Sequence, residues 1–185
     1  MSEQTYEWFG ADYQWLAESG CLTLVKALDE REALLRFGAD VATARLMTFQ
    51  DAAAEVMASG GSAALALAVA VDGGTLVVEY NQFHGEEPAV LIALSAGTTA
   101  SSVARTINGA GSFTHAHNGS IRTAFPLGHP DRRTGTAPDE LLEHLPPPGD
   151  EPDPFLTALG LATRTTSVSF NATALQGEFL GAELT

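Results

Sequence analysis

The sequence predicts an α+β domain: an antiparallel or mixed sheet of about five strands with helices packed on it. Three observations support this fold class. Short apolar strands alternate with runs of helix-forming residues, and two pairs of strands are joined by tight-turn sequences. Hydrophobic residues make up 45% of the 185 residues and charged residues 17%. This composition is typical of a globular chain with a buried core.

The first strand pair has the clearest pattern. Between residues 65 and 71, leucine and valine alternate with alanine, so the larger side chains share one face. A second apolar stretch, residues 75–80, follows a turn at either Asp72-Gly73 or Gly73-Gly74, and both registers bury the same faces. The alanine face lets a helix approach closely, so we expect this hairpin near the middle of the sheet.

Capping residues, which satisfy the free backbone N–H groups of a first turn, predict three helices. The capping pairs are Asp29 with Glu32, Thr48 with Asp51, and Asp153 with Pro154. A further helix is expected over residues 86–97, which acids open and Gly97 closes. Strands are expected at residues 21–25 and within residues 98–107.

The chain is predicted to divide into three parts. Residues 1–145 form a single α+β domain, residues 146–154 a proline-rich acidic linker, and residues 155–185 a C-terminal helical segment. Proline-rich segments of this kind are stiff and extended. Asn171 is expected to cap a last helix that reaches Phe179.

The net charge of −14 excludes several classes of partner. Phosphate binding needs a basic surface, so neither nucleic acid nor an anionic membrane is expected. The apolar run at residues 63–71 is shorter than the ~20 residues that cross a bilayer. The first residues lack the basic start of a secretory signal, so we expect a cytoplasmic protein. Cys21 is the only cysteine, which rules out an internal disulfide, and it is expected to be an inert core residue.

From Pro88 to Pro130 the chain contains no aspartate or glutamate. An even spread of the 23 acids would place about five in this acid-free stretch. Two interpretations stay open. The stretch forms either a binding face for an anionic small molecule or a buried region in which carboxylates are too costly.

A candidate ligand-binding site lies within the acid-free stretch, around a predicted two-residue turn at Asn118-Gly119. The turn places four side chains on one sheet face with Arg105 nearby: His115, His117, Ser120 and Arg122. The opposite face is expected to be buried; it carries Ala116, Ile121, Thr123 and Phe125. The first face is either a solvated surface without a role or a cationic cluster that binds an anion or shuttles a proton. No third metal ligand is placed by the sequence, so no metal or cofactor is expected.

The chain resembles a set of small actinobacterial proteins of unknown function. The resemblance spans roughly residues 12–145, and its positions are hydrophobic or structural. They are Trp15 with Cys21-Leu-Thr-Leu-Val25, Leu34-Leu-Arg-Phe-Gly38, Leu94-Ser-Ala-Gly-Thr98, Asn108, Phe113, Gly119 and Phe125. It implies a fold that behaves as one unit and assigns no activity. His115 and His117 are not among the usual residues of these proteins.

Two hypotheses for function follow from the sequence. The leading one is a non-catalytic acidic binding module that neutralises or regulates a protein partner, comparable in charge and size to immunity or adaptor proteins. The alternative is a small-molecule-binding protein or enzyme that acts on an anionic ligand through the His/Arg sheet face. No residue is assigned a catalytic role, because the chain has neither a Gly-x-Ser-x-Gly elbow nor a lysine-containing phosphate loop.

Overall fold

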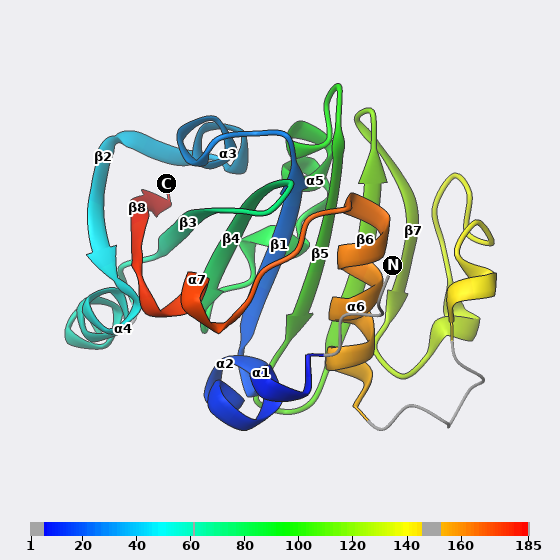
Figure 1. The fold of residues 1–185 in the computed structure, drawn as a ribbon, viewed down its shortest axis with the longest axis horizontal. Helices are drawn as coiled ribbons and strands as arrows, with labels where there is room; N and C mark the ends of the chain where they lie inside the picture. Colours follow the sequence, from blue (N-terminus) through cyan, green and yellow to red (C-terminus); the bar gives the residue numbers. More distant parts are fainter. Residues whose placement is uncertain (1–5, 61, 146–152, 185) are drawn as a thin grey trace.

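A computed structural model describes residues 6–60, 62–145 and 153–184. Its eight strands are β1 (Gly20–Lys26), β2 (Ala39–Thr48), β3 (Leu65–Val71), β4 (Gly74–Tyr80), β5 (Thr99–Arg105), β6 (Gly111–His117), β7 (Ser120–Pro126) and β8 (Glu178–Leu184). They form one antiparallel sheet in the order β2-β8-β3-β4-β1-β5-β6-β7 (Figure 1). The α+β class is confirmed, but the expectation of about five strands is wrong.

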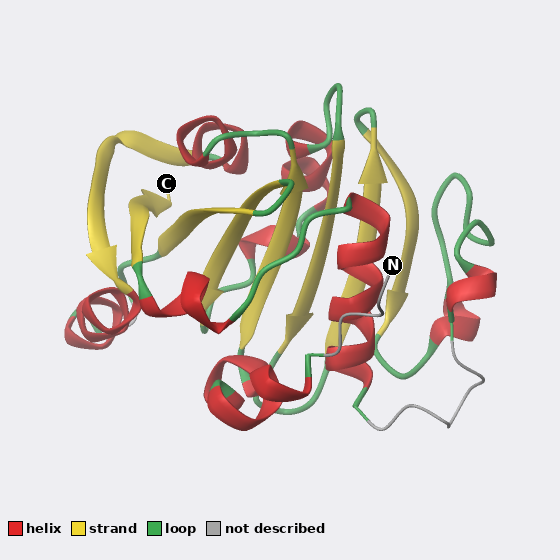
Figure 2. Ribbon diagram, viewed as in Figure 1, coloured by secondary structure: helices red, strands yellow, loops and turns green. Residues whose placement is uncertain are grey.

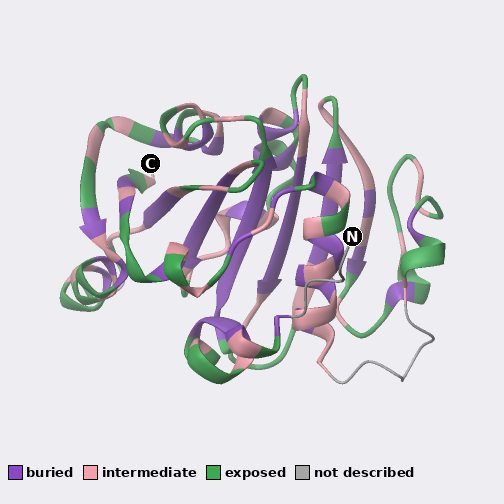
Figure 3. Cartoon of the chain, in the orientation of Figure 1, coloured by how far each residue is buried: buried purple, intermediate pink, exposed green. Residues whose placement is uncertain are grey.

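Helices cover both faces of the sheet (Figure 2). One face carries α1 (Glu7–Asp12), α2 (Gln14–Glu18), α4 (Phe49–Ala58), α6 (Pro154–Thr166) and α7 (Ala172–Gln176). The other carries α3 (Glu30–Phe37) and α5 (Pro88–Leu94). The connections also hold short 3₁₀ helices η1 (His84–Glu86), η2 (Pro130–Arg132) and η3 (Leu142–His144). As a result, the central strands are buried over most of their length (Figure 3).

The β3–β4 hairpin turns at Asp72-Gly73, since Val71 pairs with Gly74. Its larger side chains face the core beneath α4 and α7, and its alanines face α3. Ala66 and Ala68 are fully buried there. Small side chains let α3 pack closely, and the hairpin lies near the middle of the sheet as predicted.

The predicted caps are present. Asp29 accepts a hydrogen bond from the Glu32 backbone, and Gly38 ends α3 with a left-handed φ of 93°. Thr48 and Asp51 form a reciprocal capping box on α4. Asp153 caps α6, where it accepts from the Phe155 backbone. In the described part of the chain, no helix combines the length and apolarity needed to cross a membrane.

The C-terminal segment differs from the expected purely helical one. Asn171 caps α7 as predicted, but that helix ends at Gln176, before Phe179. The chain then forms β8, which pairs with β2 on one side and β3 on the other. Residues 178–184 alternate between the two cores, so they complete the sheet as a strand. Of the predicted 146–154 linker, residues 146–152 lie outside the described residues.

We expect Phe179→Ala to lower the free energy of unfolding by about 3–5 kcal/mol, because the side chain is fully buried in β8 and its removal leaves a cavity. The neighbouring exposed Glu178 provides the control. Glu178→Ala is expected to change stability by no more than about 0.5 kcal/mol. Urea denaturation of both variants measures the difference. Equal, small effects would show that residues 178–184 are not part of the core.

Candidate functional site

The β6–β7 hairpin turns at Asn118-Gly119 as predicted, with φ of 50° and 73°. His117 lies opposite Ser120. A β-bulge then shifts the register, and Arg122 is the extra residue on β7. His115 therefore lies opposite Thr123 and not, as predicted, opposite Arg122.

The bulge also corrects the prediction of the buried face. Beyond it, the side chains of β7 alternate in the opposite sense, because an extra residue shifts a two-residue period by one. Phe125 lies opposite Phe113, in the core beneath α6, and Thr123 shares the His115 face. Ala116 and Ile121 remain on the other face, as predicted. Both faces of the hairpin therefore pack against the protein.

His115 is buried beneath α6, with 7% of its surface exposed. Its Nδ1 lies 2.9 Å from the Ser101 Oγ on β5, and that hydroxyl lies 2.8 Å from the Thr165 Oγ1 on α6. Burial lowers the pKa of His115, and the nearby Glu140 carboxylate partly opposes this. The imidazole is therefore connected to α6 through the Ser101 hydroxyl.

Arg122 is brought to the same place by Glu140, which comes from the connection after β7. Its Nε and Nη2 both donate to Glu140 Oε2, at 3.1 and 2.9 Å. The other carboxylate oxygen, Oε1, lies 3.8 Å from His115 Nε2. We call Ser101, His115, Arg122, Glu140 and Thr165 the His115 network. The Arg122 guanidinium in this network is neutralised by the Glu140 carboxylate of the same chain.

His117 and Ser120 lie nearer the turn and outside this network. His117 is exposed, and its Nδ1 lies 2.9 Å from the Thr99 hydroxyl. The Asn118 side-chain amide lies 2.9 Å from its Nε2. The Ser120 hydroxyl is 3.3 Å from that of Thr136. These two predicted site residues are thus held by local hydrogen bonds.

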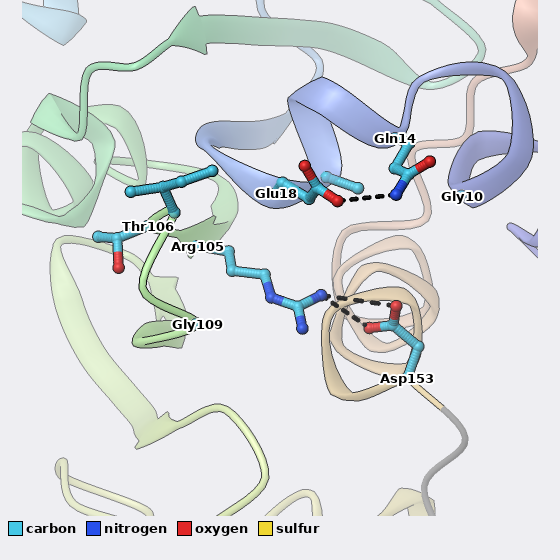
Figure 4. A pocket seen from close by; sticks show the side chains of 9 residues that line it. Gly10, Gln14, Glu18, Arg105, Thr106, Gly109 and Asp153 are labelled. Carbon is cyan, nitrogen blue, oxygen red and sulfur yellow. Dashed lines mark hydrogen bonds and ion pairs between the residues drawn. The ribbon is translucent and has the colours of Figure 1, made fainter.

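Arg105 is separated from the other predicted site residues. It ends β5, whereas Thr99, at the start of that strand, pairs with His117. Six residues of strand span about 20 Å. The Arg105 Nη1 donates to both oxygens of Asp153, at 3.2 and 3.5 Å. Arg105 lines a cavity between α2, the β5–β6 loop and the start of α6 (Figure 4).

The structure explains the acid-free stretch. It supplies α5, β5, β6 and β7; the middles of β5 and β6 are buried, as are Thr123 and Phe125 on β7. A carboxylate at such a position would lose its hydration without a partner. The two arginines within the stretch are neutralised from outside it, Arg105 by Asp153 and Arg122 by Glu140. These contacts favour the buried-region interpretation over an open anion-binding face.

A second polar group is buried on the opposite face of the sheet. Glu79 is 1% exposed and accepts hydrogen bonds from the backbone N–H groups of His84 and Gly85, at 2.8 and 2.9 Å. Burial raises the pKa of Glu79, and these hydrogen bonds oppose the rise. The Cys21 sulfur lies 3.2 Å from the Ser102 hydroxyl. Burial, with Glu79 nearby, raises the pKa of the Cys21 thiol well above its ordinary value, so it stays protonated and unreactive.

The His115 network contains a serine, a histidine and a carboxylate, the residue types of a hydrolase triad. Ser101 is fully buried, and its hydroxyl is shared between His115 and Thr165. A nucleophile must reach its substrate, so this arrangement fits a structural link better than acyl transfer. Among the described residues, no three His, Cys, Asp or Glu side chains group as metal ligands.

The sequence did not indicate three contacts of the predicted site and its surroundings: Arg122 with Glu140, Arg105 with Asp153, and Ser101 with Thr165. Glu140, Asp153 and Thr165 each lie at least 17 residues from the side chains that they contact. No local pattern marks such a pairing. The signal that could have helped is the excess of arginine over acid within the stretch, since buried or half-buried cations need a carboxylate from elsewhere.

The family model of DUF6461, a family of unknown function, matches residues 1–179. The chain belongs to DUF6461. The match extends through α6 and α7 to the first residues of β8, so the family covers the sheet and the helices on both of its faces. The predicted membership of an uncharacterised family is confirmed. No curated protein and no solved structure matches this DUF6461 chain.

We expect the free energy of unfolding to fall as the pH is lowered through the ordinary histidine pKa of 6.5. The pKa of His115 is lower in the folded chain, so the unfolded chain binds this proton more tightly and stability is lost toward acid pH. His115→Gln should remove this part of the pH dependence, and exposed His117→Gln should retain it. Chemical denaturation at pH 7.5 and 5.5 tests both variants. An unchanged pH dependence in His115→Gln would contradict the assignment.

Proposed function

We propose that this DUF6461 protein is a non-catalytic acidic module that binds a basic protein partner and neutralises or regulates it. The supporting observation is how the chain uses its own charges. It has 23 acidic and nine basic residues, and five of the arginines form ion pairs with carboxylates of the same chain. These pairs are Arg36–Glu32, Arg45–Glu55, Arg105–Asp153, Arg122–Glu140 and Arg133–Asp139.

Internal pairing changes what the surface offers to a partner. An arginine already held by a carboxylate attracts an incoming anion weakly, whereas surplus carboxylates remain in contact with solvent. Several described acids are exposed and form no ion pair, among them Glu7, Asp12, Glu18 and Glu178. A surplus of one sign steers partners of the opposite sign toward the surface and speeds association.

The alternative, an anionic small molecule on the His/Arg sheet face, has less support. It requires Arg105, His115, His117 and Arg122 to converge on one concave site. Arg105 lies about 20 Å along the sheet from His117. His115 is covered by α6, and both arginines already bind carboxylates. A protein partner requires no such convergence.

The test is to identify the partner and measure how the complex depends on salt. Cross-linking in the producing organism followed by mass spectrometry is expected to identify a partner with a basic surface. For the purified pair, the dissociation constant should rise at least tenfold between 0.1 and 1 M NaCl, because the screening length falls from about 10 to about 3 Å.

The control is the same titration with sucrose in place of salt, which leaves charge screening unchanged. A dissociation constant that does not respond to NaCl would contradict the proposal, as would a partner with a net acidic surface. Turnover of a small-molecule substrate by the purified protein would contradict its non-catalytic part.

A further inference from the structure

A cavity of about 480 Å³ opens at one corner of the molecule. Three elements far apart in sequence form its walls: the α1–α2 pair, the loop between β5 and β6, and the first residue before α6 (Figure 4). Gly10 allows α1 to pack closely against α6, since a Cβ at this position would lie 3.2 Å from the Leu156 side chain. The cavity thus lies where the N-terminal helices, the β5–β6 loop and the end of β5 meet.

The ionisable groups of the cavity leave one unbalanced carboxylate. Arg105 and Asp153 neutralise each other. Glu18, on α2, receives a hydrogen bond from the Gln14 amide at 2.8 Å, and a neutral amide leaves its charge in place. Within the described residues, the second oxygen of Glu18 has no hydrogen bond and no ion pair. The lining therefore carries a formal charge of −1, with a free acceptor at Glu18.

The remaining lining is partly apolar. Ala17 lies beside Glu18, and Ile107 extends from the β5–β6 loop with 71% of its surface exposed. A side chain that is apolar along its stem and positively charged at its tip matches such walls. One free carboxylate oxygen suits the compact ammonium of lysine, whereas the planar fork of arginine favours two acceptor oxygens.

Building on the proposed function, we propose that this cavity receives a lysine side chain of the basic partner. The aliphatic stem lies against Ile107 and Ala17, and the ammonium binds Glu18. Asp153 keeps the Arg105 guanidinium from repelling the incoming cation. Arg105 is thus a positioning residue that sets the charge of the cavity through its pairing with Asp153.

The experiment uses a capped peptide with four lysines as the probe and its fully acetylated form as the neutral control. We expect the lysine peptide to bind and the acetylated peptide not to bind. Glu18→Gln should weaken binding about threefold, the scale of one exposed charge pair. Glu178→Gln removes the same charge from an exposed position on β8, away from the cavity, and should have a smaller effect.

Replacing Arg105, the cation of the cavity, should change the affinity for the lysine peptide in the opposite direction. Arg105→Gln leaves Asp153 without its ion pair and changes the formal charge of the lining from −1 to −2, so the lysine peptide should bind about threefold more tightly. Arg105→Lys keeps the charge and should not tighten binding, which also controls for a folding defect. Amide NMR shifts should cluster at Gln14, Glu18 and Thr106.

The outcomes separate the cavity from the proposed function. Equal weakening by Glu18→Gln and Glu178→Gln would overturn the cavity while leaving a general acidic surface in place. Weaker binding by Arg105→Gln, with Arg105→Lys unchanged, would show that the charge of the lining does not act as proposed and would also overturn the cavity. If a basic partner is found but the lysine peptide does not bind, the cavity inference fails alone. If neither binds, both proposals fail.

Discussion

Helices cover both faces of the sheet, and this burial shapes the other polar contacts of the fold. Central strands under helices on either side have few positions where a polar group can meet water, so each polar side chain there needs a partner within the protein. Among the described residues, every buried side-chain nitrogen and oxygen has a hydrogen-bond partner. His115 finds Ser101, and Glu79 finds two backbone N–H groups. These networks hold α6 and η1 against the sheet.

Burial of the sheet also determines where carboxylates without an ion pair are found. The strands of the acid-free stretch cannot carry carboxylates in their buried parts, so the partners of Arg105 and Arg122 come from segments that fold over the sheet. Pairing neutralises the cations, while surplus acids stay on surface helices such as α1 and α2. The surface field is therefore negative although the sheet itself carries arginine and histidine. The proposed recognition of a basic partner would use this surplus of acid, and the Glu18 cavity lies where an unpaired carboxylate meets apolar side chains.

The sequence predicted correctly those features that depend only on residues close together in the chain. The caps of α3 and α4, the turns at residues 72–73 and 118–119, and the alternation of β3 are all set by neighbours within a few residues. Other features depend on distant segments. β2 is an edge strand with a broken register and no clean alternation, and β8 is recognisable as a strand only because β2 and β3 flank it. The bulge at Arg122 inverted half of the predicted face, and its ion pair with Glu140, 18 residues away, has no signature in the sequence. The turn at Asn118-Gly119 was thus predicted correctly, whereas the register beyond it was not.

Carboxylates of the same chain hold Arg105 and Arg122 of the sheet. Nitrogen-15 NMR of the arginine side chains, recorded while inorganic phosphate is added at constant ionic strength, tests this pairing. The Nε–H signals of Arg105 and Arg122 should stay in place at millimolar phosphate. A saturating shift of either signal would mean that the guanidinium is available to anions and that the pairing does not neutralise it.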